Sequence, residues 1–243
     1  MRSFVVAFTL AHTAGLAQKV DLPAGTGHLR PGPEWVVLDA TRLAQKERTD
    51  DPKPELARAM LGGVVEELRK RDRTGQHVVL HTTGANDRLR LINCYRADGS
   101  AKGSDLRGKT VIDAMKKAIE PTIAAEGATG TFVDHVHPDL FATGSVRLRF
   151  EVRLQDQRWF LDYHAVPAGP SLQFFEVLHF PDDPDAEGAI EAVLRSFDGA
   201  RDGYRRSLLE NAMYGGAIGG VLGGLLWWRR RRKAASVPTP GAD

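Results

Sequence analysis

The chain has 243 residues, with 33 Lys and Arg against 31 Asp and Glu, and a net charge of +2. Five positive charges stand together at Arg229–Lys233, and removing these five from +2 leaves −3 on the rest of the chain. The basic balance therefore gives no indication of nucleic-acid binding. Cys94 is the only cysteine, which excludes an intrachain disulfide and a cysteine zinc cluster, and we expect it to be buried.

Residues 1–17 (MRSFVVAFTLAHTAGLA) have the layout of a secretory signal peptide. Arg2 supplies a positive start, Phe4–Ala11 form a short apolar centre, and a small-x-small ending predicts cleavage after Ala17. An uncleaved N-terminal anchor and a buried strand are the alternatives. Residues 18–33, which are rich in Gly and Pro, are predicted to be an extended lead-in.

Residues 34–198 are predicted to form one extracytoplasmic α+β domain. Short apolar runs bounded by turn residues predict three strands in its first half, at residues 34–39, 76–82 and 88–95. Apolar residues at helical spacing predict helices over 54–71 and 110–125. Pro121 is expected to kink the second helix or end it early. Residues 96–108 are expected to form an exposed loop.

The second half of this domain is predicted to be a strand meander followed by a helix. From residue 146 to residue 154, apolar residues alternate with charged ones, so one face of this strand is predicted to be buried and the other solvated. Further strands over 159–166 and 171–180 complete a three-stranded antiparallel meander. Asp182–Asp185 are predicted to cap a helix over 186–197, and 199–210 to form a charged connector.

Residues 211–228 are predicted to form one transmembrane helix, because Ala212–Trp228 carry no formal charge. The predicted membrane anchor is an aromatic pair followed by a basic block: Trp227, Trp228, Arg229, Arg230, Arg231, Arg232 and Lys233. Residues 229–243 are then a basic cytoplasmic tail, and the domain lies outside the cell membrane. A buried soluble helix and a removable sorting tail are the alternatives.

Two rows of glycine at four-residue spacing lie along this segment: Gly215, Gly219 and Gly223, and Gly216, Gly220 and Gly224. Such rows allow two helix backbones to approach closely in lipid. They predict a homo-oligomer seam or a docking strip for a partner transmembrane helix. The alternative is that these glycines have no role in association and are present because glycine is common in bilayer helices.

The sequence Asp134-His135-Val136-His137-Pro138-Asp139 is the best candidate for chemistry. In a strand, His135 and His137 project from the same face, where two imidazoles can share a metal with Asp139 or Asp134 as the oxygen ligand. Pro138 favours a loop without such a role. His77 and His81 lie roughly 13 Å apart in a strand and cannot bind one ion directly, so we expect them to be solvated or hydrogen-bonded.

The alternating strand also places Arg147, Arg149 and Arg153 on its polar face. They are predicted to be a solvated charged face, partly neutralised by Glu151. Binding of an anionic ligand or partner is the alternative.

The order of these elements, from Pro33-Glu34-Trp35 to Leu194-Arg195-Ser196-Phe197, resembles the PsbP-like fold of the PsbP and DcrB-related proteins. The resemblance covers about residues 30–197. It implies an antiparallel sheet with helices on both sides, an α/β/α sandwich, and a binding or assembly module without shared catalytic residues. The membrane helix is not part of that fold.

Two functions follow as hypotheses. The first is a non-enzymatic single-pass membrane protein, whose exported domain binds a partner or ligand and whose glycine-rich helix anchors and assembles it in the lipid bilayer. No cofactor or nucleic acid is expected. The alternative is an extracytoplasmic metal-dependent hydrolase that uses Asp134, His135, His137 and Asp139. Motifs for serine hydrolases, zinc proteases, thiol redox and nucleotide binding were not found.

Overall fold

The computed structural model describes residues 18–45, 55–84, 87–125, 128–154 and 157–203. The predicted signal peptide, the transmembrane helix, its glycine rows and anchor, and the basic tail lie outside these residues. Within the described ranges, no helix is long and apolar enough to cross a membrane.

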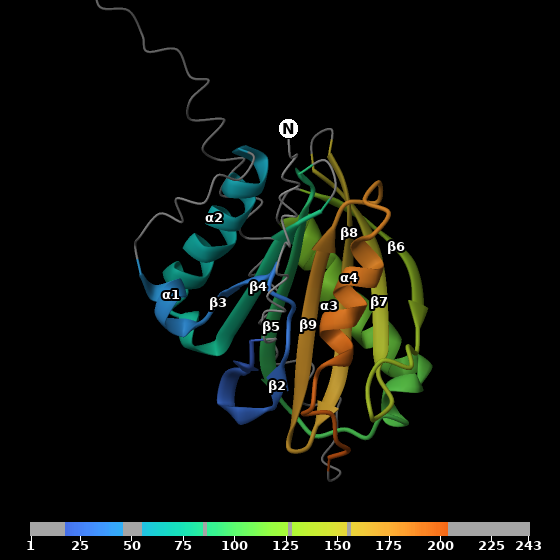
Figure 1. Ribbon diagram of the computed structural model, residues 1–243. Coiled ribbons are helices and arrows are strands. Elements are labelled where there is room, and N and C mark those ends of the chain that lie inside the picture. Colours follow the sequence, from blue (N-terminus) through green and yellow to red (C-terminus); the bar gives the residue numbers. More distant parts are fainter. Residues whose placement is uncertain (1–17, 46–54, 85–86, 126–127, 155–156, 204–243) are drawn as a thin grey trace, which may run out of the picture.

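A seven-stranded antiparallel sheet with the order β3-β4-β5-β9-β8-β7-β6 forms the centre of the molecule (Figure 1). Its strands are β3 (Val36–Leu38), β4 (His77–Thr83), β5 (Leu89–Asp98), β6 (Thr129–Val136), β7 (Val146–Leu154), β8 (Gln157–Ala168) and β9 (Ser171–His179). Consecutive strands β6 to β9 are neighbours, and β9 pairs with β5. The predicted α+β class with a large antiparallel sheet is therefore confirmed.

Helices cover both faces of this sheet. The helices are α1 (Ala40–Ala44), α2 (Glu55–Lys70), α3 (Lys109–Ala125) and α4 (Ala186–Arg195). In Figure 1, α4 lies in front of the sheet beside β9, and α3 lies behind it. Because α3 connects β5 to β6, it carries the chain across the rear face to the far edge of the sheet.

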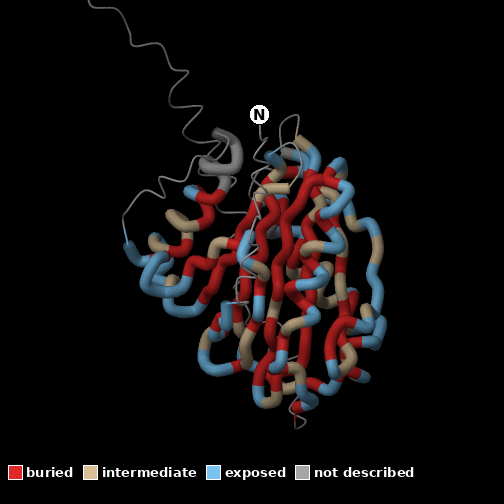
Figure 2. The backbone as a smooth tube through the Cα atoms, in the orientation of Figure 1, coloured by how far each residue is buried: buried red, intermediate tan, exposed pale blue. Residues whose placement is uncertain are grey.

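Alternation along the strands builds two hydrophobic cores, one on each face. On the rear face, Leu148 and Phe150 of β7 belong to the same cluster as Ile119 of α3. On the front face, Phe175 of β9 belongs to the cluster of Leu194 of α4. Figure 2 shows the central strands buried along most of their length.

The meander contains a fourth strand, β6, beyond the three that the sequence predicted. β6 is an edge strand whose residues are exposed or half-buried, and Figure 2 shows the outer edge exposed along it. Alternating burial is the signal that identifies strands in a sequence, and an edge strand that is open to solvent lacks it. The register of β6 with β7 shifts between Phe132 and Asp134, which marks a β-bulge.

The folded part extends beyond residues 34–198 at both ends. The expected lead-in forms a small sheet of β1 (Val20–Asp21) and β2 (His28–Leu29), and Leu29 is fully buried. The start of the expected connector is also held to the sheet, since Arg201 N donates to Pro167 O and Gly203 N donates to Ala101 O, both at 2.9 Å. The connector from residue 204 to residue 210 lies outside the described residues.

Two local expectations are wrong in part. Residues 96–108 are not wholly an exposed loop, because β5 continues to Asp98 and Ala101 and Leu106 are buried. The predicted helix over 110–125 is close to α3, but the early end expected at Pro121 is wrong, because the helix runs to Ala125. Ile119 and Ile123 on either side of Pro121 are buried in the rear core, and this burial stabilises the last turn in spite of the missing N–H donor.

Candidate functional site

The residues predicted to bind a metal lie at the end of β6 and in the loop that follows it. Asp134 pairs in register with Arg149, and His135 with Leu148 of the rear core, so these two side chains belong to opposite faces of the sheet. The carboxylate of Asp134 accepts from Arg147 Nη2 at 3.2 Å. His137 Nδ1 lies 3.0 Å from the Ser145 carbonyl oxygen.

The predicted metal set is therefore not assembled. The rings of His135 and His137 are close, with centroids 6.0 Å apart. Asp134 is held by Arg147, and Asp139 contributes its backbone oxygen to Arg195 at 3.1 Å. Across the described part of the chain, no group of three or more His, Cys, Asp or Glu is placed to hold a metal ion.

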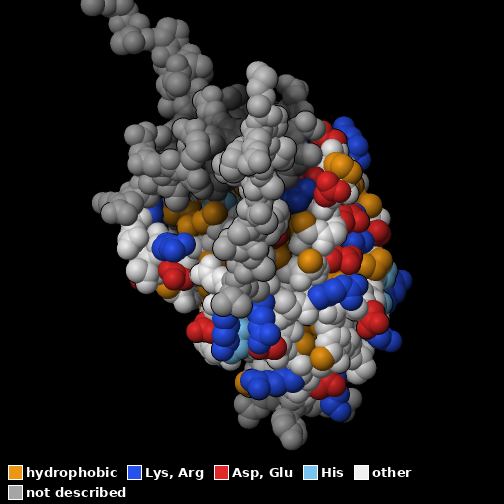
Figure 3. Space-filling model, in the orientation of Figure 1, with side chains coloured by type: hydrophobic (Ala, Val, Ile, Leu, Met, Phe, Trp, Pro, Cys, Tyr) orange, Lys and Arg blue, Asp and Glu red, His pale blue; other side chains and the backbone are white. Residues whose placement is uncertain are grey.

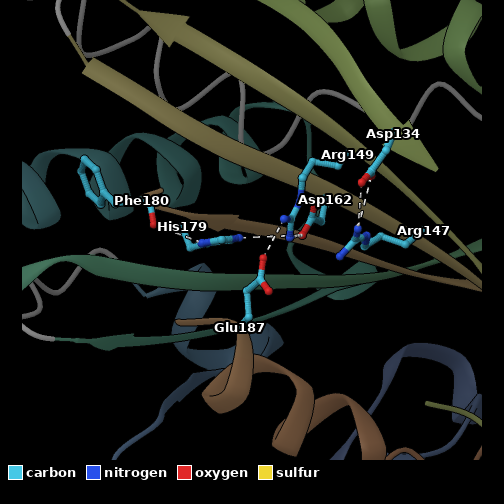
Figure 4. A network of polar contacts seen from close by, with 7 residues as sticks. All are labelled: Asp134, Arg147, Arg149, Asp162, His179, Phe180 and Glu187. Atoms are coloured by element: carbon cyan, nitrogen blue, oxygen red, sulfur yellow. Dashed lines mark hydrogen bonds and ion pairs between the residues drawn. The ribbon is translucent and has the colours of Figure 1, made fainter. Parts of the chain in front are cut away.

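Arg149 is the centre of a charged network on the front face (Figure 4). Its Nε and Nη2 donate to the two oxygens of Asp162, both at 2.7 Å, and its Nη1 donates to Glu187 of α4 at 2.6 Å. The guanidinium also lies 4.6 Å from the ring centre of Phe160. The bidentate pair joins β7 to β8, and the bond to Glu187 joins both strands to α4.

Burial corrects the expectation of a solvated arginine face. The side chains of Arg147 and Arg149 are only 17% and 11% exposed, whereas that of Arg153 is 66% exposed. Helix α4 reaches Arg149 through Glu187, and each of the three arginines pairs with a carboxylate of the protein itself. Figure 3 shows acidic and basic side chains interspersed on this side of the molecule.

The electrostatics of the network follow from its burial. Burial opposes ionisation of Asp162, but the hydrogen bonds from Arg149, with the His179 ring nitrogen 3.8 Å away, outweigh it, so the pKa of Asp162 lies well below its ordinary value. Burial lowers the pKa of His164 to about 4, against a smaller opposing effect of Asp162. His164 Nδ1 has no hydrogen-bond partner among the described residues. His164 is therefore neutral at pH 7.

A second polar network crosses the rear face inside the core. His77 Nδ1 lies 2.9 Å from Asn93 Oδ1, and Asn93 Nδ2 donates to Glu176 Oε2 at 2.9 Å. Tyr163 donates its hydroxyl to the other oxygen of Glu176 at 2.9 Å. Asn93 and Glu176 are fully buried.

This network was not predicted, although the sequence holds two signals for it: an acidic residue within the apolar run SLQFFEVLHF and an asparagine within RLRLINCY. The expectation that His77 is hydrogen-bonded is confirmed. Cys94 is buried as expected, and burial raises the pKa of its thiol far above the ordinary value. A thiol of this kind is unreactive.

The outer strand β6 carries the exposed apolar surface. Among the described residues, the large hydrophobic side chains that are exposed are Val133, at 47%, and Val136, at 37%. Both lie on β6. Behind the strand, the Lys116 ammonium lies 4.0 Å from the ring centre of Phe132. The candidate surface thus combines an open strand edge, two valines and a nearby lysine.

The sequence matches no protein-family model and no curated protein. A similar solved structure is the solution structure of cyanobacterial PsbP (CyanoP) from Synechocystis sp. PCC 6803. It is 13% identical, with a TM-score of 0.47, and the match covers 80% of this chain and 98% of that chain. The class of this protein is defined by its own antiparallel sheet and flanking helices.

Proposed function

We propose that this chain is a non-enzymatic single-pass membrane protein whose exported α+β domain binds a partner. In this proposal residues 211–228 span the bilayer, residues 229–243 lie in the cytoplasm, and the glycine rows hold copies or partner helices together. We also propose a PsbP-like arrangement for the domain, on the order of its elements along the chain.

The observation that carries the binding function is the exposure of β6. An eight-residue strand at the edge of the large sheet carries Val133 and Val136 exposed to solvent. Natural edge strands are usually short, charged or covered, because an open edge pairs with other chains. A long edge with apolar side chains is therefore typical of an interaction surface.

The charged residues nearby support a binding module over the hydrolase alternative. Asp134 is engaged by Arg147, and Arg149 by Asp162 and Glu187. A general base or a metal ligand needs a carboxylate that is available to the reacting group. These carboxylates instead connect strands and helix.

The membrane part of the proposal rests on sequence. Residues 212–228 have no formal charge and are followed by Arg229–Lys233, the pattern of an aromatic anchor and a cytoplasmic stop. Gly203 is the last described residue, and its N–H donates to the Ala101 carbonyl oxygen, three residues after the end of β5.

Membrane fractionation of the full-length chain tests this function. We expect the chain to stay with membranes after alkaline carbonate washing, and a Leu222→Asp, Leu225→Asp double variant to be released, because aspartate in the bilayer costs several kcal/mol, about 2.5–3.5 for each residue. Copurification after mild detergent extraction and crosslinking then identifies the partner. Recovery of the unaltered full-length chain in the aqueous phase would exclude the membrane-bound function.

A further inference from the structure

We propose that β6 is a strand-addition site, at which an extended segment of a partner protein, rich in valine-like and acidic residues, forms an eighth strand of the sheet. This inference rests on the proposed binding function and deepens it by stating the chemistry of the partner.

The position of β6 provides the backbone groups. β6 is last in the strand order and pairs with β7 on its inner side. In the described part of the chain, no strand pairs with its outer side. The N–H and C=O groups that point outward on such a strand are the template used in β-strand addition.

The opposite edge of the sheet offers no comparable template. β3 has only three residues, Val36–Leu38, and helix α1 begins at Ala40 directly after it. Trp35 at its start is buried, and Leu38 at its end is buried in the rear core. A short edge strand that is followed directly by a helix is protected from pairing with another chain. Only β6 therefore combines length with exposure in the described sheet.

The side chains of β6 indicate an apolar partner residue. Val133 and Val136 are exposed on the strand, and the register shift beside Val133 leaves this residue without a Cα partner on β7. A β-bulge of this kind re-aims side chains at the sheet edge. Valine-like residues on an added strand, one beside each of these side chains, remove apolar surface from water.

The charge beside the edge indicates an acidic partner. The Lys116 ammonium lies over the ring of Phe132 of β6. Asp134, the acidic residue of β6, is already paired with Arg147. A partner carboxylate gains from the Lys116 ammonium. A second copy of this chain would instead bring its own Lys116 to the same edge, which disfavours a β6–β6 dimer.

Hydrogen exchange on the full-length chain in mild detergent tests the inference. The probe is an eight-residue synthetic peptide that alternates valine with glutamate. With the peptide at about ten times its dissociation constant, we expect exchange of the amides of residues 129–136 to slow about tenfold. The matched peptide with alternate backbone amides methylated keeps the side chains but cannot form a ladder, and we expect no protection from it.

Two charge variants test the side-chain chemistry. Lys116→Glu reverses the charge beside Phe132, and we expect it to weaken binding of the glutamate peptide about tenfold or more, and to favour the same peptide with lysine in place of glutamate. Lys117→Glu makes the same change at the next position of α3, where the side chain is exposed. We expect this control to change the affinity less than about threefold.

Three results would overturn the inference: no protection of residues 129–136 by the glutamate peptide, equal protection by the methylated peptide, or protection that rises with protein concentration in the absence of peptide. The last result would identify a second copy as the occupant. The chain can fail to bind the peptide at β6 and still stay in membranes and copurify with a partner. That result would exclude the strand-addition site and leave the proposed function supported.

Discussion

At the scale of single residues, the front face depends on one arginine with two unequal partners. The Asp162 side chain is 5% exposed, and the Glu187 side chain is 56% exposed, although both accept short hydrogen bonds from Arg149. A buried charge that loses its partner is not rehydrated, whereas an exposed partner is readily replaced by water. The two carboxylates should therefore differ widely in their effect on stability.

Replacing these carboxylates one at a time measures that difference. We expect Asp162→Asn to lower the free energy of unfolding by about 3–5 kcal/mol, because Arg149 stays buried without its bidentate partner. Glu187→Gln should cost less than about 1 kcal/mol. Urea unfolding followed by circular dichroism provides both values. Equal losses for the two variants would show that burial does not set the strength of this network.

His164 gives stability a defined dependence on pH. Its pKa is about 4 in the folded chain, against 6.5 when it is exposed. Between these values the unfolded chain binds a proton that the folded chain does not, so stability falls as the pH drops from 6.5 towards 4. Burial lowers the pKa of His77 as well, with the same sign.

We expect a slope of up to about 1.4 kcal/mol per pH unit from His164 in this window. Urea unfolding between pH 7 and pH 4 measures it. In a His164→Phe variant, the slope of the free energy of unfolding against pH should become shallower by the contribution of one proton. The slope that remains comes from the other titrating groups. An unchanged slope in this variant would show that folding does not shift the pKa of His164.

At the scale of elements, glycines in α2 and β6 have opposite roles. Among the described residues, a Cβ added at Gly62 of helix α2 meets no atom within 4 Å apart from the nearby backbone of the helix itself. A Cβ added at Gly130 of β6 lies 2.6 Å from Ile123 Cγ2 of α3. The first glycine only adds flexibility to a helix, while the second allows β6 to approach α3.

Alanine at these two positions should shift stability in opposite directions. We expect Gly62→Ala to raise the free energy of unfolding by about 0.5–1 kcal/mol, because glycine is a poor helix former. Gly130→Ala should lower it by about 1–3 kcal/mol, because the buried Ile123 must move. Thermal and urea unfolding measure both changes. Destabilisation by Gly62→Ala would contradict the open surroundings of that residue.

At the scale of the whole molecule, the domain and the segment that follows it have separate roles in the proposal. The domain presents β6, and the described chain leaves the sheet at Gly203. The glycine rows of residues 215–224 remain a sequence-based prediction of association in the bilayer. Because the rows lie outside the described residues, their role is tested by the full-length chain alone.

We expect Gly219→Ile together with Gly220→Ile to weaken self-association in detergent by about tenfold or more, because bulky side chains keep helix backbones apart. Analytical ultracentrifugation or crosslinking at several detergent ratios measures the change. Ala217→Ile with Val221→Ile, between the glycine positions, is the matched control and should retain association. If the glycine substitutions leave self-association unchanged, the glycine rows do not form the homo-oligomer seam.

Long-range ion pairs were beyond sequence-based prediction. Arg90 and Asp183 form a bidentate pair at 2.6 Å although 93 positions separate them. The acidic run 182–185 was predicted to cap α4, yet Asp185 makes no capping bond with its side chain. A short run of acidic residues looks the same in the sequence whether it caps a helix or forms an ion pair. Only the strand that packs beside it in the fold, here β5 with Arg90, distinguishes the two.

Features that depend on local periodicity could be predicted from the sequence. Alternation from Val146 to Leu154 predicted β7, and helical spacing predicted α2 and α3. The burial of Cys94 was expected because it is the only cysteine and has no partner for a disulfide. The tertiary structure decided which residues meet across strands: Arg149 with Asp162, Asn93 with Glu176, and β6 as the open edge. The physical reason is that side-chain periodicity is encoded within a few residues, whereas strand register and order arise from packing between segments far apart in the chain.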